Sequence, residues 1–105
     1  MQMYRVEHTQ SSESDLDGIF HHIAIELCEP LIAIKLLDVL DEAIGELDKM
    51  PERHPLVDIS EFRELGYRKM VVNSDYIVLY TIDEEQNIVY IQRVTNTLQN
   101  WVKFL

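Results

Sequence analysis

The sequence predicts a single two-layer α+β domain over residues 1–105, with a helical hairpin packed on an antiparallel sheet in the order β-α-α-β-β-β. The first half of the chain carries apolar residues at helical spacing. The second half carries three β-branched and aromatic runs separated by short polar turns. The chain has 105 residues, of which 47% are hydrophobic, which suffices for one core and is too little for two.

The N-terminal half is expected to hold one strand and two helices. Residues 3–8 are β-prone, and Ser11 or Ser12 is the expected N-cap of a helix over residues 13–27. Pro30 suits the first turn of a second helix over residues 30–48.

The second helix is apolar over a wider arc than packing on one sheet requires. Leu36, Val39 and Ala43 belong to this surplus, while the polar residues are confined to a narrow stripe. We expect the surplus to bind a partner or a second copy, and additional core packing is the alternative.

The C-terminal half predicts a three-stranded meander over about residues 66–72, 75–82 and 87–95. Asn73 and Ser74 suit a tight hairpin turn. The middle strand has almost no polar alternation, so it is expected to be central and buried on both faces. Residues 57–64 fit either a short extended piece or one turn of helix.

Composition limits the classes of function. The net charge of −10 opposes general binding to nucleic acid. No apolar run is long enough for a membrane span, and the start lacks the pattern of a signal peptide. The single cysteine, Cys28, suits a reducing cytosol and is expected to be a buried structural thiol. His8 and His54 are expected at the surface, and the adjacent His21 and His22 point apart on a helix, so no metal site is expected.

Two arginines, Arg68 and Arg93, lie inside otherwise apolar strands at the two ends of the meander. Arginine is seldom buried unless it is paired. They are therefore expected either to pair with acidic residues near the strand ends or to contact a target. The acidic residues considered are Glu61, Glu64 and Asp83.

The ordered set of motifs in residues 65–70, 76–80 and 93–94 resembles the RelE/ParE superfamily of bacterial type II toxins, close to its plasmid-stabilisation branch. The resemblance extends over nearly the whole chain. It implies a small cytoplasmic toxin that needs no cofactor and is neutralised by a cognate antitoxin, which lays a helix and an extended segment over it. A homodimer or a toxin–antitoxin heterotetramer is the implied assembly. RelE-like members cleave mRNA on the ribosome, whereas ParE-like members poison DNA gyrase.

The resemblance also assigns roles to particular residues. Arg68, Arg93 and Tyr67 would be catalytic if the protein is a nuclease. The expected antitoxin- or target-binding residues are Leu36, Val39, Ala43, Trp101 and Phe104. Trp101 and Phe104 are also expected to cap an open end of the sheet or core, a site that an antitoxin would share.

Two departures from the family pattern weaken the hypothesis that the protein is a nuclease. Asn96 stands where His or Tyr is common, and Leu98 stands where a second Arg is common. Cleavage of RNA needs proton transfer and cationic stabilisation of the phosphate, which neither residue supplies.

Three hypotheses follow from this resemblance. The first is a ParE-like toxin that inhibits growth by binding a target such as gyrase. The second is a RelE-like mRNA endonuclease whose proton transfers come from Tyr67, His54 or ribosomal groups. The third is a non-toxic relic that only binds antitoxin.

Overall fold

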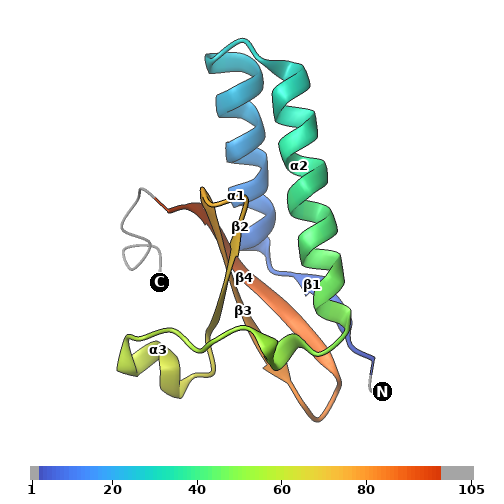
Figure 1. Ribbon diagram of the computed structural model, residues 1–105, viewed down its shortest axis with the longest axis vertical. Coiled ribbons are helices and arrows are strands. Elements are labelled where there is room, and N and C mark those ends of the chain that lie inside the picture. The colour runs from blue at the N-terminus through green and yellow to red at the C-terminus, as the bar shows by residue number, and fades with distance from the viewer. Residues whose placement is uncertain (1–2, 98–105) are drawn as a thin grey trace.

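Two long helices stand on one face of a four-stranded sheet in the computed structural model, which describes residues 3–97 (Figure 1). The predicted order of elements is confirmed. The helices and strands are β1 (Arg5–His8), α1 (Gln10–His21), α2 (Pro30–Gly45), α3 (Ser60–Glu64), β2 (Arg68–Val72), β3 (Tyr76–Asp83) and β4 (Ile88–Asn96). The ambiguous segment before β2 contains the short helix α3. None of the helices within residues 3–97 is long and apolar enough to cross a membrane.

The sheet has the strand order β1-β4-β3-β2 and is mixed, not wholly antiparallel as expected. β1 runs parallel to β4, with Arg5 opposite Ile88 and His8 opposite Ile91. The reason lies in the helical hairpin, which returns the chain to the end where β1 began. There the Tyr4 amide donates to the Asp48 carbonyl at 2.8 Å. β2 therefore starts at the same end as β1, and two antiparallel turns later β4 runs in the same direction.

Helix α1 begins at Thr9, earlier than the expected caps Ser11 and Ser12. The Thr9 hydroxyl oxygen accepts from the Ser12 amide at 3.2 Å. The Thr9 hydroxyl also donates to the Ile91 carbonyl at 2.8 Å, so the cap is anchored on β4. Ser12 is fully buried and donates its own hydroxyl to the Thr9 carbonyl. A π-helical segment, His22–Glu26, continues α1 toward the hairpin turn.

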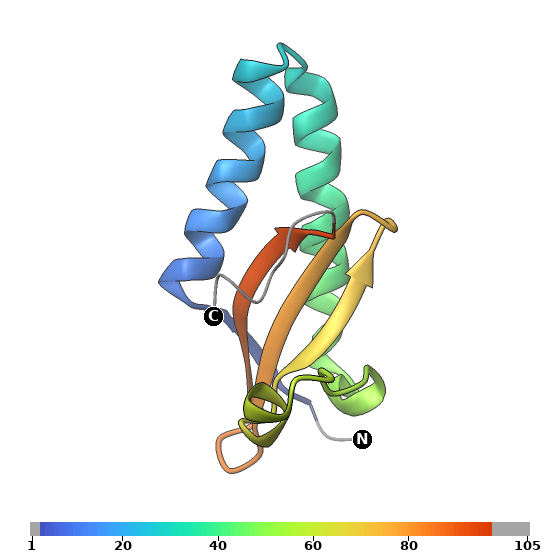
Figure 2. The same ribbon diagram turned by 90° about the vertical axis from the view of Figure 1, so that its left-hand side faces the viewer.

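The hairpin turn contradicts the prediction for Cys28, which is exposed. Its φ is +56°, so the backbone turns through the left-handed region immediately before α2 begins at Pro30. The apolar pattern around Cys28 predicts a buried thiol because such a pattern is typical of a helix face that covers a core. The hairpin instead projects beyond the sheet, and no core lies beneath its end (Figure 2).

The main core lies between the helices and the sheet. Leu40, Ile44 and Leu47 pack with residues of β3 and β4 that point toward the helices. β3 is buried continuously from Ile77 to Tyr80, which confirms the prediction of a central strand. Its alternate residues Ile77 and Leu79 form a second, smaller cluster with Val57, Phe62 and Tyr67.

The turns follow their sequence signals. Asn73 and Ser74 both adopt positive φ in the predicted turn between β2 and β3. The Asp83 carboxylate accepts the amides of Glu85 and Gln86 in the turn between β3 and β4.

Tyr80 supplies a test of the buried polar contacts. Its hydroxyl donates to the Pro51 carbonyl at 2.5 Å, and burial raises the pKa of Tyr80 to about 12. Tyr80→Phe leaves that carbonyl unpaired and is expected to lower the free energy of unfolding by about 1–2 kcal/mol in urea titrations. Tyr90→Phe, at a half-buried residue of β4, is the matched control and should cost less.

The stability of Tyr80→Phe should also depend on pH differently from that of the parent protein. Because the folded-state pKa is raised above 10.0, the contribution of Tyr80 is complete below pH 10 and is lost as the pH rises toward 12. Tyr80→Phe should therefore lose less stability between pH 10 and 12 than the parent protein. Equal losses in both proteins would contradict the burial of this hydroxyl.

Candidate functional site

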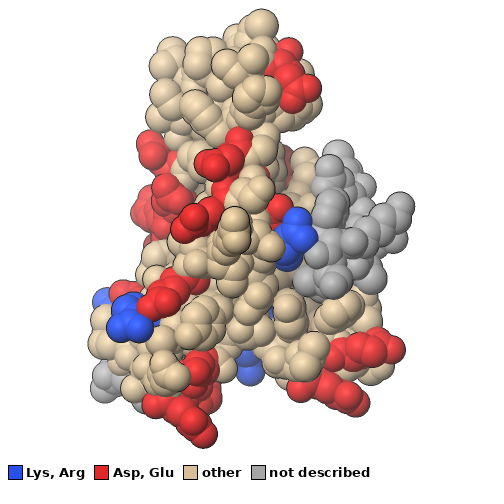
Figure 3. All heavy atoms as spheres, turned by 180° about the vertical axis from the view of Figure 1, so that it is seen from behind, with Lys and Arg blue, Asp and Glu red and all other residues tan. Residues whose placement is uncertain are grey.

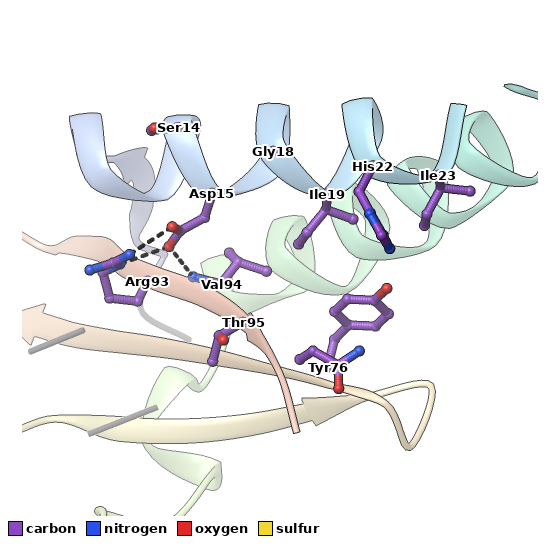
Figure 4. Close-up of a pocket in the computed structure, with 11 residues that line it drawn as sticks. Ser14, Asp15, Gly18, Ile19, His22, Ile23, Tyr76, Arg93, Val94 and Thr95 are labelled. Carbon is purple, nitrogen blue, oxygen red and sulfur yellow. Dashed lines mark hydrogen bonds and ion pairs between the residues drawn. The ribbon is translucent and has the colours of Figure 1, made fainter. Parts of the chain in front are cut away.

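Arg93 is held by Asp15 in a two-pronged ion pair between β4 and α1 (Figure 4). The Arg93 Nε and Nη2 atoms each lie 2.8 Å from an Asp15 carboxylate oxygen. The Val94 amide donates to the same carboxylate at 2.9 Å. The Arg93 and Asp15 side chains are only 21% and 16% exposed, and the hydrogen bond to Asp15 raises the pKa of Arg93. This geometry is the strong form of an arginine–carboxylate contact.

The partner of Arg93 differs from all three candidates chosen from the sequence. Asp15 comes from the second turn of α1, 78 residues away in the chain. Glu61 and Glu64 belong to the exposed helix α3, and Asp83 caps its own turn. Asp15 cannot be identified from residues near Arg93 in the sequence, because only the fold brings α1 onto the end of β4.

Arg68 is bound to main-chain oxygens and not to an acid. Its Nη1 donates to the carbonyl of His54 at 2.6 Å and to that of Glu52 at 3.0 Å. The guanidinium therefore fixes the loop that connects the helical hairpin to α3. Arg68 thus makes a structural contact, which is one of the two alternatives expected for it, but its partners are main-chain carbonyls and not the expected carboxylates.

The loop that Arg68 fixes contains His54, which has a buried ring nitrogen. The His54 Nε2 atom is buried and finds no hydrogen-bond partner within residues 3–97, and its ring meets Tyr80 edge-on at 6.3 Å. Burial, assisted by the charge of Arg53, lowers the pKa of His54. His54 is therefore only partly at the surface as expected, because the loop folds back over β3 and covers its Nε2 atom.

Arg68, Arg93 and Tyr67 do not converge on one site. Arg68 pairs in register with Tyr80, and Arg93 pairs with Leu79, so the two arginines lie on strands that flank β3. Their guanidinium groups contact different elements, the 52–54 loop and α1. Tyr67 packs on Phe62, with ring centroids 5.7 Å apart.

Tyr67 and Tyr90 share a shallow hollow of about 610 Å³ with the turn between β3 and β4. Three carboxylates also line it, those of Asp83, Glu84 and Glu85. Carboxylates repel a phosphate backbone, so this hollow is a poor platform for stacking RNA bases.

The helical hairpin and the sheet enclose a groove, and it contains two of the predicted binding residues. One end is a hollow of about 480 Å³ between α1 and the end of β4, where the side chains of Ile19 and His22 point toward Tyr76 (Figure 4). The other end is a hollow of about 340 Å³ beside α2, and both ends include Ile23 and Tyr76. We call this surface the hairpin groove. It is lined at the α2 end by Ile32, Lys35, Leu36, Val39, Asn73 and Asp75.

The other predicted binding residues lie elsewhere. Ala43 is half-buried against the main core, and Trp101 and Phe104 lie outside the described residues. The sequence reasoning missed Ile23, Ile32 and Tyr76. The signal for Ile32 was present, because Ile32, Leu36, Val39 and Ala43 recur at i, i+4, i+7 and i+11 along one side of a helix. In the described part of the chain, no three potential metal-binding side chains gather as a site.

Comparisons with known proteins agree with this architecture. A family model described as the ParE toxin of the type II toxin-antitoxin system, parDE, matches residues 6–101. No curated protein matches the chain.

The fold is shared with other solved structures, three of which align over nearly the whole chain. The chromosomal ParDE TA system from P. aeruginosa aligns with a TM-score of 0.74 and 18% identity, over 90% of this chain and 96% of that chain. The toxin-antitoxin complex RelBE2 from Mycobacterium tuberculosis aligns with a TM-score of 0.64 and 24% identity, over 94% and 97%. YafQ from E. coli strain BL21(DE3) aligns with a TM-score of 0.50 and 18% identity, over 90% and 94%.

The ion pair between α1 and β4 can be tested by a double-mutant cycle. Asp15→Asn removes the carboxylate from a largely buried guanidinium and is expected to cost about 2–3 kcal/mol of unfolding free energy. Arg93→Gln should cost a similar amount. The double variant should lose at least about 1 kcal/mol less than the sum of the single losses, as measured by urea denaturation. Additive losses would show that the two side chains are not coupled.

His54 predicts a dependence of stability on mildly acidic pH. Its pKa is lowered in the folded state, so its contribution is complete above the unfolded value of 6.5 and is lost as the pH falls below it. His54→Phe keeps an aromatic ring against Tyr80 and removes the titrating nitrogen. Between pH 7 and 5 the variant should lose less stability than the parent protein, whereas between pH 7 and 8 the difference between the two should stay constant. A parallel decline of both proteins below pH 6.5 would refute the assignment.

Proposed function

The chain belongs to the ParE toxin family of type II toxin–antitoxin systems, and on that premise we propose that it arrests growth by binding a large cellular target such as DNA gyrase. Gyrase is the target of the ParE-like members of the superfamily that the sequence resembles. In this proposal the protein acts by occupying its target and does not cut RNA.

The observation that carries the proposal is the engagement of both strand arginines inside the fold. A nuclease needs cations aimed at the scissile phosphate. Arg93 is paired with Asp15 through two bonds, and Arg68 donates to two main-chain carbonyls. These contacts orient both guanidinium groups toward oxygen atoms of the fold itself and not toward a common phosphate site.

The groups available for proton transfer support the same choice. Asn96, at the end of β4, lines the hairpin groove and has no titrating group near neutrality. The buried Nε2 atom of His54 faces away from solvent, and Tyr67 lies beside an acidic hollow. A binding mechanism needs no group of this kind.

We further propose that the antitoxin covers the hairpin groove. Leu36 and Val39 present an apolar stripe there, opposite the aromatic ring of Tyr76. The neighbouring edge of the sheet is also accessible. The Lys69 amide and the Tyr67 carbonyl point away from β3 and pair with residues 55–57. Main-chain groups alternate in direction along a strand, so those of Val71 also point away from β3, beyond the end of that pairing. Val71 is 56% exposed. A helix and an extended segment of an antitoxin would together find an apolar stripe and a free strand edge.

Inducible expression in a bacterial host tests the proposal. The parent protein is expected to arrest growth with altered plasmid supercoiling, while sequencing of transcript 5′ ends shows no codon-phased cuts. Arg68→Ala should reduce the arrest only as far as it lowers the amount of folded protein, because Arg68 holds a loop and does no chemistry.

Two results would contradict the proposal in different ways. Codon-phased mRNA cuts that vanish in Arg68→Ala at unchanged folded protein would make the chain a RelE-like endonuclease. Normal growth at full expression of folded protein would identify a relic that retains only antitoxin binding.

A further inference from the structure

The end of the helical hairpin carries large apolar side chains in the open. Ile25, Leu27, Leu31 and Ile34 are between 49% and 72% exposed. We call these four residues the hairpin tip. The hairpin stands well clear of the sheet at this end, so the tip has no sheet beneath it (Figures 1 and 2).

Internal packing does not account for the hairpin tip. The buried side chains at this level are the small ones, Ala24 and Ala33, which suit a close approach of the two helical segments. The large buried residues of α2, Leu40 and Ile44, lie about two to three turns beyond Ala33, over the sheet. The larger apolar side chains near the turn are thus left outside, and exposed apolar patches of this kind mark binding surfaces.

The charge along the helical hairpin that carries the tip is strongly one-sided. Residues 17–46 hold seven carboxylates against one lysine, a net charge of −6 out of the −10 of the whole chain. Figure 3 shows acidic side chains along the helical hairpin beneath an end that is largely uncharged. The carboxylates belong to Asp17, Glu26, Glu29, Asp38, Asp41, Glu42 and Glu46.

The exposed apolar side chains of the tip and the acidic residues of the hairpin together limit which partners can bind there. A second copy of the chain would bring Glu26 and Glu29 toward identical carboxylates, and an anionic membrane surface would meet the same repulsion. A segment with apolar residues on one side and lysine or arginine on the flanks satisfies both features of the surface. We infer that the hairpin tip binds a basic amphipathic helix of a protein partner, with apolar residues at helical spacing against Leu31 and Ile34.

This inference goes beyond the proposed toxin activity, because it concerns a separate surface and names the charge of what binds there. A peptide-binding experiment tests it. The probe is a fluorescein-labelled 18-residue helical peptide with leucines on one face and lysines on the other. The comparison peptide carries glutamates in place of the lysines. Binding of both peptides to the full chain is followed by fluorescence anisotropy.

Two variants with the same change of charge separate apolar docking from general attraction. Leu31→Asp and Leu65→Asp each replace a leucine that is about 70% exposed, 72% and 67% respectively, the first in the tip and the second beside β2. The added carboxylate would by itself strengthen the binding of a basic peptide. We expect Leu31→Asp to weaken binding of the lysine peptide by about tenfold or more, and Leu65→Asp to leave it within about twofold. Circular dichroism confirms that both variants are folded.

The site of binding can be located through Cys28. It is the single cysteine of the chain and is exposed in the hairpin turn, next to Leu27. A photoreactive maleimide on Cys28 should cross-link the lysine peptide in the parent protein and in Leu65→Asp, but not in Leu31→Asp.

Three results would overturn the inference. Equal effects of the two substitutions on affinity would show that binding of the peptide depends only on the net charge of the protein. Equal affinity for the glutamate peptide would remove the requirement for a basic partner. A dimer of the parent protein in sedimentation that Leu31→Asp dissociates would show that a second copy occupies the tip. None of these results bears on growth arrest, so the toxin proposal stands or falls separately.

Discussion

The pairing of Asp15 with Arg93 is the contact on which the placement of the helical hairpin depends. One carboxylate accepts two bonds from a guanidinium and a third from the Val94 main chain, so α1 is fixed to β4 in both position and direction. The Thr9 cap adds a second anchor on the same strand through the Ile91 carbonyl. With α1 fixed at this end, the other end of the hairpin is free to project. The hairpin groove and the exposed tip both follow from that arrangement.

A second consequence concerns how positive charge is distributed. The family resemblance presents Arg68 and Arg93 as groups for phosphate, but in this chain the fold itself occupies them. Much of the surface that remains is acidic, both along the hairpin and in the turn between β3 and β4 (Figure 3). Such a surface favours protein partners with basic character over nucleic acid. Antitoxin binding, target binding and docking at the tip are all compatible with that electrostatic character.

Local patterns predicted what is local in this fold. Helical spacing located α2 closely, and the run around Val78 and Tyr80 identified the central strand. Leu36 and Val39 line the hairpin groove, and their role in binding stays a prediction. Most of the failures involve contacts between distant segments. The direction of β1, the partner of Arg93 and the burial of His54 depend on where the hairpin and the 51–54 loop return to the sheet. Cys28 was misplaced because periodicity cannot reveal that a helix extends past its core.

The parallel pairing of β1 with β4 has a consequence for synthesis of the protein on the ribosome. Residues 5–8 pair with residues 88–91, and Asp15 pairs with Arg93. Neither contact can form until residues 88–93 have been synthesised. Pairings between such distant segments slow folding because a long loop must close first. The nascent chain therefore carries an apolar hairpin without its complete sheet until β4 emerges. Interrupted translation would release a fragment prone to aggregation in place of a folded toxin.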